Sequence, residues 1–313
     1  MNTDHPAGRD GTGPQITQMS QISELELTRQ TRLNAALRFG IFILLYLCFA
    51  LLLGWVAVAL VRSLPVSSAT GSMLETVAAG LTAVAAATLL VLAGLDDRPP
   101  AYIGLGRVPG WLAEMGCGFV LGAAMIGVIV LVLGASGHLR YEAGPAGAGR
   151  GALRLAAVLG IFLLGALHEE LLFRGYPFQR LIEVMGAPAA VLLLAGAFGA
   201  VHSGNPHASI PGALNTALVG VLFSIAYLKT ARLWLPIGLH WGWNFSEGAS
   251  GLPVSGITID ALPWSARVSG SEWLQGGGYG PEASLTATAV IGAAILVLLL
   301  RKAPEKEDAR LQL

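Results

Sequence analysis

Charged residues in this chain gather in short clusters between long apolar runs, and this spacing constrains the fold more than any other feature. About 20 apolar residues are needed for an α-helix to cross the hydrocarbon core of a bilayer. The runs without Asp, Glu, Lys or Arg that approach or exceed this length are 41–61, 76–95, 115–139, 184–228 and 283–300. The run 184–228 is 45 residues long, and turn residues at 203–206 together with Pro211 divide it into two spans.

Two more segments count as spans only if they include polar residues. The segment 155–173 contains a His-Glu-Glu triplet, and the segment 233–246 contains a His and an Asn. Counting these two, the sequence predicts an all-α, polytopic membrane protein, a bundle of about eight transmembrane helices. Gly118 and Gly122, four residues apart, are expected to allow close contact between two of these helices.

The composition excludes a conventional water-soluble enzyme, since 54% of the residues are hydrophobic and only 12% are charged. The 19 basic and 19 acidic residues cancel, so we expect no nucleic-acid partner and look for partners in the lipid bilayer. Cys48 and Cys117 each lie in an apolar run, which argues against a disulfide framework and against a cysteine-based zinc site. We expect both thiols to be buried and to pack as small hydrophobic groups.

The placement of Lys and Arg predicts the orientation, because cytoplasmic loops are enriched in these residues. With eight spans, 14 of the 19 basic residues fall on one side, so both termini are predicted to be cytoplasmic. The loop 250–282 then lies on the opposite side, where Trp264, Trp273 and Tyr279 are expected to anchor at the membrane interface.

The same pattern predicts three regions along the chain. They are a flexible cytoplasmic arm at 1–33 with a surface helix at 20–32, a transmembrane domain at 34–302 with its core at about 155–250, and a cytoplasmic tail at 303–313.

Three polar clusters lie inside the predicted spans. An ionisable side chain at the centre of a membrane helix costs about 2.5 to 3.5 kcal/mol, so such residues usually face the protein interior or a water-filled cavity. The clusters are HEELLFR at 168–174, FGAVH at 198–202 and HWGWN at 240–244. We expect their side chains to gather around one cavity within the bilayer.

The spacing of these residues along a helix predicts which side chains lie on the same face. Residues four apart share a face, so Glu170 is expected to pair with Arg174, whereas Glu169 points elsewhere and keeps a free carboxylate. His240 and Asn244 are also four apart, so a ring nitrogen and an amide converge. A carboxylate that takes a proton from water, imidazoles that orient it and an amide that donates to an oxyanion can hydrolyse an amide without a nucleophilic Ser or Cys.

Other interpretations stay open at this point. Buried polar groups also join helices through hydrogen bonds, and polar clusters also line the pathways of transporters. A zinc site that uses Glu169, His202 and His240 is a further alternative, although the triplet at 168–170 lacks the second His of a His-Glu-x-x-His helix. The role of His168 is ambiguous.

The clusters resemble the motifs of the CAAX prenyl protease and bacteriocin-processing family, also called the CPBP, Abi or type II CAAX endopeptidase family. Its pattern is Glu-Glu-x-x-x-Arg, Phe-x-x-x-His and His-x-x-x-Asn on successive membrane helices. The three motifs occur here in that order, at 169–174, 198–202 and 240–244. The resemblance is specific over about residues 155–250.

The resemblance implies an intramembrane endopeptidase of the glutamate type, with no metal and no cofactor, that cleaves a membrane-associated protein or peptide. The catalytic residues that it implies are Glu169, Glu170, Arg174, His202, His240 and Asn244. In the family the first Glu activates water together with the His of the second motif, the second Glu and the Arg support it, and the last motif binds the water or the oxyanion. The alternative function is a non-catalytic membrane scaffold, or a bacteriocin-immunity or regulatory factor, that uses the same cavity for binding.

The origin of the chain and the depth of the motifs add two expectations. Of the 19 basic residues 16 are Arg, which favours a GC-rich bacterial genome and therefore the bacterial cytoplasmic membrane. At 1.5 Å per residue from the predicted cytoplasmic surface, Glu169 and His240 lie about 7 and 10 Å deep, but His202 lies about 21 Å deep. We expect residues 175–187 to dip into the membrane, so that the next helix begins deeper.

Overall fold

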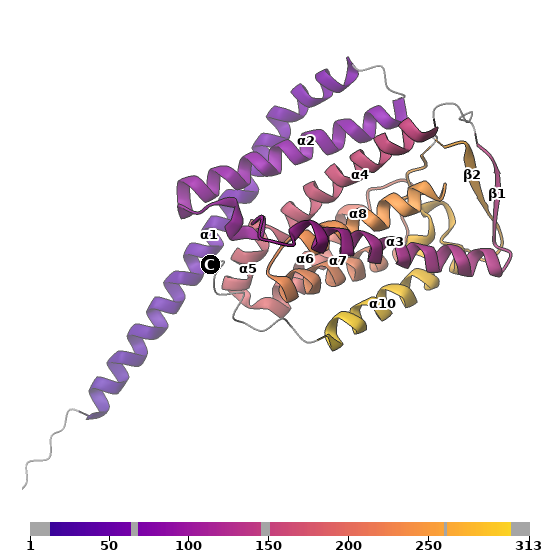
Figure 1. The fold of residues 1–313 in the computed structure, drawn as a ribbon. Coiled ribbons are helices and arrows are strands. Elements are labelled where there is room, and N and C mark those ends of the chain that lie inside the picture. The colour runs from indigo at the N-terminus through magenta and orange to yellow at the C-terminus, as the bar shows by residue number, and fades with distance from the viewer. Residues whose placement is uncertain (1–12, 64–67, 145–150, 260–261, 302–313) are drawn as a thin grey trace, which may run out of the picture.

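The structure is a computed structural model that describes residues 13–63, 68–144, 151–259 and 262–301. The predicted tail at 303–313 and the first residues of the predicted arm lie outside the described residues. Helices dominate the chain (Figure 1), and five of them are long and apolar enough to cross a membrane. The predicted class, an all-α polytopic membrane protein, is confirmed.

The elements follow the predicted spans in order. The long helices are α1 (Gly13–Arg62), α2 (Ser68–Val91), α3 (Trp111–Ala135), α4 (Gly151–Arg174), α5 (Tyr176–Met185), α6 (Ala187–His202), α7 (Ile210–Thr230), α8 (Trp234–Ala249) and α10 (Leu285–Leu300). The short elements are η1 (Leu92–Asp96), η2 (Pro100–Ile103), β1 (Leu139–Ala143), β2 (Trp264–Val268), α9 (Glu272–Gln275), η4 (Gly277–Tyr279) and η5 (Pro281–Ala283).

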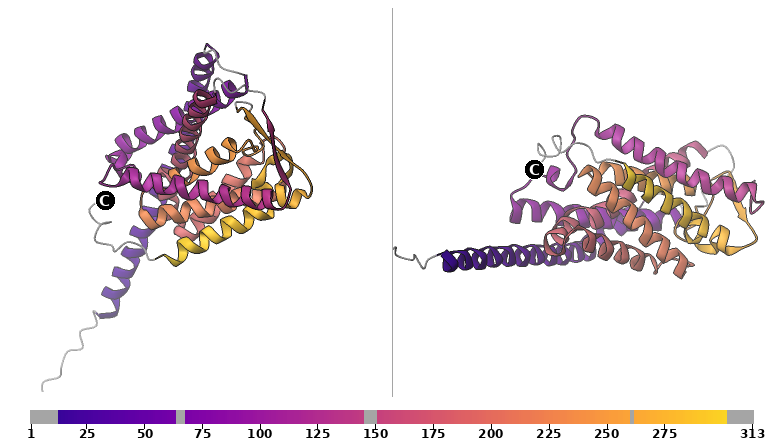
Figure 2. Two further views of the ribbon diagram at one scale, coloured as in Figure 1. Left: turned by 45° about the vertical axis from the view of Figure 1, so that its right-hand side comes forward. Right: turned by 90° about the horizontal axis from the view of Figure 1, so that it is seen from below.

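Helix α1 is longer than the sequence pattern indicates. It runs without a break through the predicted surface helix at 20–32 and on to Arg62. Its N-terminal part extends past the ends of the other helices (Figure 2). The part of the predicted arm that the structure describes is therefore helical and continuous with the first span.

The helices that carry the site are held by close glycine contacts between α3 and α8. A Cβ atom at Gly118 would lie 2.5 Å from the carbonyl oxygen of Leu235, and one at Gly242 would meet the backbone of Phe119. Because only glycine leaves room for this approach, the two backbones lie in direct contact, as the spacing of Gly118 and Gly122 predicts. This contact places α8, and with it His240 and Asn244, inside the bundle.

Two glycines allow the chain to turn between α4, α5 and α6. At Gly175 an added Cβ would meet the carbonyl oxygen of Leu171, and Gly186 has φ of +82°, a left-handed conformation that favours glycine. Between them α5 buries Tyr176 and Phe178, and Tyr176 stacks on Phe42 of α1. Whether this helix dips into the bilayer, as predicted, stays a prediction.

A two-stranded antiparallel ribbon, which the sequence analysis did not predict, joins distant parts of the chain. Strands β1 and β2 pair from Leu139 with Val268 to Ala143 with Trp264. The ribbon lies at the end of the bundle opposite the N-terminal part of α1 (Figure 1). It ties the loop after α8 to the loop before α4.

Two local expectations are wrong. Cys48 and Cys117 are exposed on the outside of the protein rather than buried, because the apolar runs that contain them face outward there. Tyr279 is 1% exposed, with its hydroxyl oxygen 3.5 Å from Oγ1 of Thr216, so it belongs to the interior and not to an interfacial belt. Burial raises the pKa of the Tyr279 hydroxyl, and the nearby Glu282 carboxylate raises it further.

Candidate active site

A buried ion pair at the end of α4 forms the base of the site. Nη1 of Arg174 donates to Oε1 of Glu170 at 3.1 Å, and Nη2 donates to the carbonyl oxygen of Gly220 at 2.9 Å. Neither charged side chain is exposed. The guanidinium also lies 4.7 Å from the ring centre of Phe198 and 5.4 Å from that of Phe223. The predicted pairing of Glu170 with Arg174 is confirmed, and it fixes both groups in place.

His240 projects from α8 onto this ion pair. Its Nδ1 lies 2.9 Å from Oε1 of Glu170, and its ring stacks on Phe223 at 5.1 Å between centres. A carboxylate paired with an Arg accepts hydrogen bonds only, so Nδ1 of His240 is the donor. In the neutral ring the other nitrogen, Nε2, then carries the lone pair. This nitrogen lies 3.7 Å from Oε2 of Glu169.

His202, at the end of α6, is oriented in the same way. Its Nδ1 lies 2.8 Å from the carbonyl oxygen of Phe198, one turn earlier in the helix. A carbonyl oxygen cannot donate, so Nδ1 is again the donor and Nε2 carries the lone pair. Nε2 of His202 lies 3.8 Å from the same oxygen of Glu169. Two helices thus aim two ring nitrogens at one carboxylate oxygen.

Glu169 is the member of the acidic pair that stays available. Its side chain is 28% exposed, and its Oε2 has no hydrogen-bond partner among the described residues. With neutral imidazoles, Oε2 of Glu169 and both Nε2 atoms are acceptors, so they cannot satisfy one another. Polar atoms about 3.7 Å apart are too far for a direct hydrogen bond, and a water between them can donate to Glu169 and to one of the two imidazoles.

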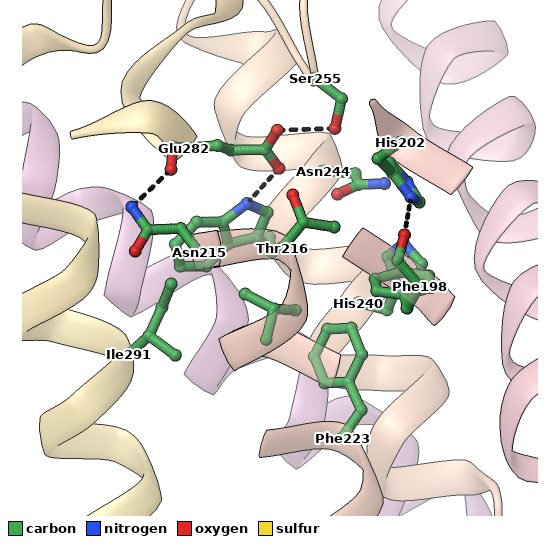
Figure 3. Close-up of a pocket in the computed structure, with 12 residues that line it drawn as sticks. Phe198, His202, Asn215, Thr216, Phe223, His240, Asn244, Ser255, Glu282 and Ile291 are labelled. Carbon is green, nitrogen blue, oxygen red and sulfur yellow. Dashed lines mark hydrogen bonds between the residues drawn. The ribbon is translucent and has the colours of Figure 1, made fainter. Parts of the chain in front are cut away.

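Asn244 lines the same cavity as His202 and His240. Figure 3 draws its side-chain amide beside His202, and no hydrogen bond holds that amide among the residues that the structure describes. The cavity leaves about 20 Å³ open to the centre of a water molecule, and 10 to 15 Å³ suffices for one. Three of the six predicted residues, His202, His240 and Asn244, therefore line the cavity. Glu169 and Glu170 reach it through their contacts with the imidazoles, and Arg174 through its pairing with Glu170.

The far side of the cavity contains polar residues that the sequence analysis missed. Glu282 accepts from the indole nitrogen of Trp243 at 3.1 Å and from the hydroxyl of Ser255 at 2.6 Å (Figure 3). Nδ2 of Asn215 donates to the backbone oxygen of Glu282 at 2.7 Å. Ser255 and Glu282 belong to a long loop in which only aromatic anchors were expected, and their sequence surroundings give no periodic signal.

Glu247 on α8 was also missed, although its spacing in the sequence could have revealed it. Glu247 is fully buried, and neither of its carboxyl oxygens has a hydrogen-bond partner among the described residues. It follows His240 by seven residues and Asn244 by three, a spacing that puts the three residues on one face of the helix. The face of α8 that carries the site is therefore polar for two turns.

His168 takes a place apart from the two other histidines. Its Nε2 lies 3.3 Å from the hydroxyl of Tyr46 on α1, and its ring fits against Gly80 of α2, where a Cβ atom would be 2.5 Å from Nε2. This ring therefore connects α4 with α1 and α2. The role of His168, which was ambiguous from the sequence, is therefore to pack and form a hydrogen bond beside the site.

The alternative zinc ligands, Glu169, His202 and His240, do approach one another. Over the described residues, however, no group of three or more His, Cys, Asp or Glu side chains has an arrangement suited to a metal ion. Both imidazoles have their Nδ1 atoms fixed by hydrogen bonds and their Nε2 atoms directed to Glu169. This geometry suits a bound water as well as it suits a metal ion.

The fold and this geometry define a class of protein, a helical membrane protein in which a carboxylate and two imidazoles converge beside a small polar cavity. Residues 151–246 match the model of the family described as type II CAAX prenyl endopeptidase Rce1-like. The predicted family resemblance is thereby confirmed over α4 to α8, the segment that supplies all six predicted site residues. No curated protein and no solved structure matches the chain.

Proposed function

We propose that this protein is an intramembrane endopeptidase that hydrolyses a peptide bond with water activated by Glu169. The convergence of both Nε2 atoms on Oε2 of Glu169, at 3.7 and 3.8 Å, is the observation that supports it most. The family match of residues 151–246 supports the endopeptidase class. The six residues act as one site in this proposal.

The proposed reaction needs one base and one set of hydrogen-bond donors. Glu169 takes a proton from water as the water oxygen attacks the carbonyl carbon of the scissile bond. The amide of Asn244 donates to the oxyanion that forms, and the lone pair of His202 or His240 accepts the second hydrogen of the water and orients it. When the carbon–nitrogen bond breaks, Glu169 returns its proton to the leaving amine. Glu170 and Arg174 take no part in proton transfer and hold His240 in its tautomer.

The proposal includes the place where the reaction happens. The substrate is a membrane-associated protein or peptide, because the site lies in a bundle of which five described helices are long and apolar enough to cross the bilayer. We place the protein in the bacterial cytoplasmic membrane with both termini in the cytoplasm, following the distribution of Lys and Arg.

A zinc-dependent variant of this proposal would use Glu169, His202 and His240 as ligands and would leave a fourth position for water. Exhaustive chelation of the purified protein, with metal analysis, distinguishes the two. We expect cleavage to survive chelation and the purified protein to contain no stoichiometric zinc. Loss of activity that zinc restores would replace the glutamate-type mechanism with the metal-dependent one.

The experiment that tests the function compares membrane peptides by mass spectrometry in cells that carry wild-type or Glu169→Gln protein. We expect at least one fragment that is present with the wild type and absent with Glu169→Gln, because the substitution removes the base and keeps its shape. A scaffold or immunity factor predicts equal peptides and full biological activity for both proteins. That result would overturn the proposal.

A further inference from the structure

An apolar groove runs along the outside of the bundle, away from the candidate active site. Its walls are α3, with Leu121 and Val128, and α10, with Val290 and Val297. Its floor is formed by α7 and α8. The groove leaves about 280 Å³ open to the centre of a water-sized sphere, far more than the polar cavity. We call this feature the α3–α10 groove.

The floor of the α3–α10 groove is part of the core. Leu222 of α7 is 1% exposed and Leu239 of α8 is 3% exposed, yet both line the groove. The walls, in contrast, contain side chains such as Val128 and Val297 that are about half exposed. The groove is therefore a gap between α3 and α10 that opens to the membrane and reaches down to buried leucines.

One end of the groove is basic. Arg301, directly after α10, is the single charged residue among the described residues that line it. Nζ of Lys229, at the end of α7, donates to the backbone oxygen of Arg301 at 2.8 Å. Arg301 and the ammonium group of Lys229 thus lie at the end where the apolar walls stop. By the Lys and Arg distribution this is the predicted cytoplasmic end.

We propose that the α3–α10 groove binds one acyl chain of an anionic phospholipid, with the phosphate at Arg301 and Lys229. The length supports a single chain, because the wall from Val290 to Arg301 spans about 16 Å, about half of the hydrocarbon core and thus one leaflet. The charge supports an anionic headgroup, since basic pockets between helices bind such lipids. A partner helix that crosses the membrane would need a groove of the full thickness.

Native mass spectrometry of the full-length protein tests this site. The protein is exchanged into mixed micelles with equal amounts of phosphatidylglycerol and phosphatidylcholine that have identical chains, and the lipids that stay bound are counted. We expect the wild type to retain one phosphatidylglycerol in preference to phosphatidylcholine. Arg301→Gln should lower this preference about fivefold, because one basic residue near a membrane surface contributes about that much to the binding of anionic lipid.

Substitutions of two small residues on the groove walls test where the acyl chain binds. Ala293→Phe on α10 and Ala124→Phe on α3 each fill the groove without changing charge, and both should abolish retention of either lipid. Arg140→Gln removes the same charge from the exposed strand β1 and should leave retention unchanged. A melting temperature equal to that of the wild type shows that each variant is folded. If one of the two groove-filling variants does not fold, the other provides the test.

Three results would overturn the site. They are equal retention of both lipids by the wild type, retention that the groove-filling variants leave intact, and a dimer whose formation those variants abolish. The last result would assign the groove to a second copy of the chain. None of these readouts depends on peptidase activity. The lipid site can therefore be refuted without refuting the proposed function, and the reverse is also true.

Discussion

At the scale of single residues, the geometry explains why the two acids of one motif have different surroundings. Glu170 is enclosed with Arg174 and accepts from His240, whereas Glu169 is partly exposed and has two ring lone pairs directed at it. The difference follows from the rotation of about 100° per residue in a helix. One acid is therefore held in a buried ion pair, and the other is partly exposed, which is the difference that the proposed mechanism uses.

Replacing Arg174 by Lys tests whether the buried ion pair with Glu170 holds the site in place. Lys keeps the charge but loses the planar fork that reaches Glu170 and the carbonyl oxygen of Gly220 together. We expect a loss of stability of about 1 to 3 kcal/mol and a cleavage rate reduced at least tenfold. Thermal unfolding in detergent and a cleavage assay measure the two effects. Arg62→Lys, at a residue that is 73% exposed, is the control, and equal melting of all three proteins would contradict the account.

The sequence draws attention to these residues because their polarity is conspicuous in an apolar helix. Glu169, His202, His240 and Asn244 stand out from neighbours that face lipid or core. The sequence did not predict which ring nitrogen faces the carboxylate, because that depends on the carbonyl oxygen of Phe198 and on Glu170, partners that only the packed structure brings within reach.

At the scale of helices, α8 can place its polar face in the cavity because α3 lies close behind it. Gly118 and Gly122 of α3 face Gly238 and Gly242 of α8, and an added Cβ at any of these four positions would meet the backbone of the other helix. Close packing of small residues replaces the hydrophobic drive that is absent between helices in lipid. The position of His240 therefore depends on glycines that touch no substrate.

Gly122→Leu is the variant that tests this contact. The larger side chain must push α8 away, so we expect destabilisation of about 1 to 3 kcal/mol and loss of most of the cleavage activity. Gly127→Leu, on the same helix with nothing within 4 Å of its Cβ position, should behave like the wild type. Melting curves and cleavage rates of the pair provide the measurement. If the two variants were equally stable and equally active, the contact would not hold the site.

The helices were easier to predict from the sequence than their connections. Long uncharged runs became α1, α2, α3 and α7, since their length alone demands a span. The ribbon of β1 and β2 was missed, because it depends on long-range contacts. Strand β1, for example, has five residues and gains its partner more than 120 residues later in the chain.

At the scale of the whole molecule, the loop after α8 closes one side of the cavity. Glu282 joins Trp243 of α8 to Ser255 of the loop, and Asn215 of α7 holds the backbone at Glu282 and at Ser284. The loop thus contributes to the walls of the site although it lies outside the family match. Sequence analysis predicted that it lies on one side of the membrane, but not that it folds back into the interior.

Glu282→Ala should loosen this closure. Without its two acceptor oxygens the loop loses the hydrogen bonds that link Ser255 and Glu282 to Trp243 of α8, so we expect faster proteolysis within residues 250–284 and stability reduced by about 1 to 3 kcal/mol. Limited proteolysis followed by mass spectrometry measures the first effect. Glu272→Ala, an exposed acid in the same loop, is the control. A loop that is cut at the wild-type rate in Glu282→Ala would show that this acid does not hold it.

The most direct test of the whole account is the rate at which purified Glu169→Gln cleaves a substrate peptide in proteoliposomes. Loss of a general base costs about 10²- to 10⁴-fold, so kcat/KM should fall by that factor while the melting temperature stays within a few degrees of the wild type. Glu142→Gln, the same change on the exposed strand β1, should keep the wild-type rate. Wild-type cleavage by folded Glu169→Gln would contradict the central claim that this carboxylate activates the water.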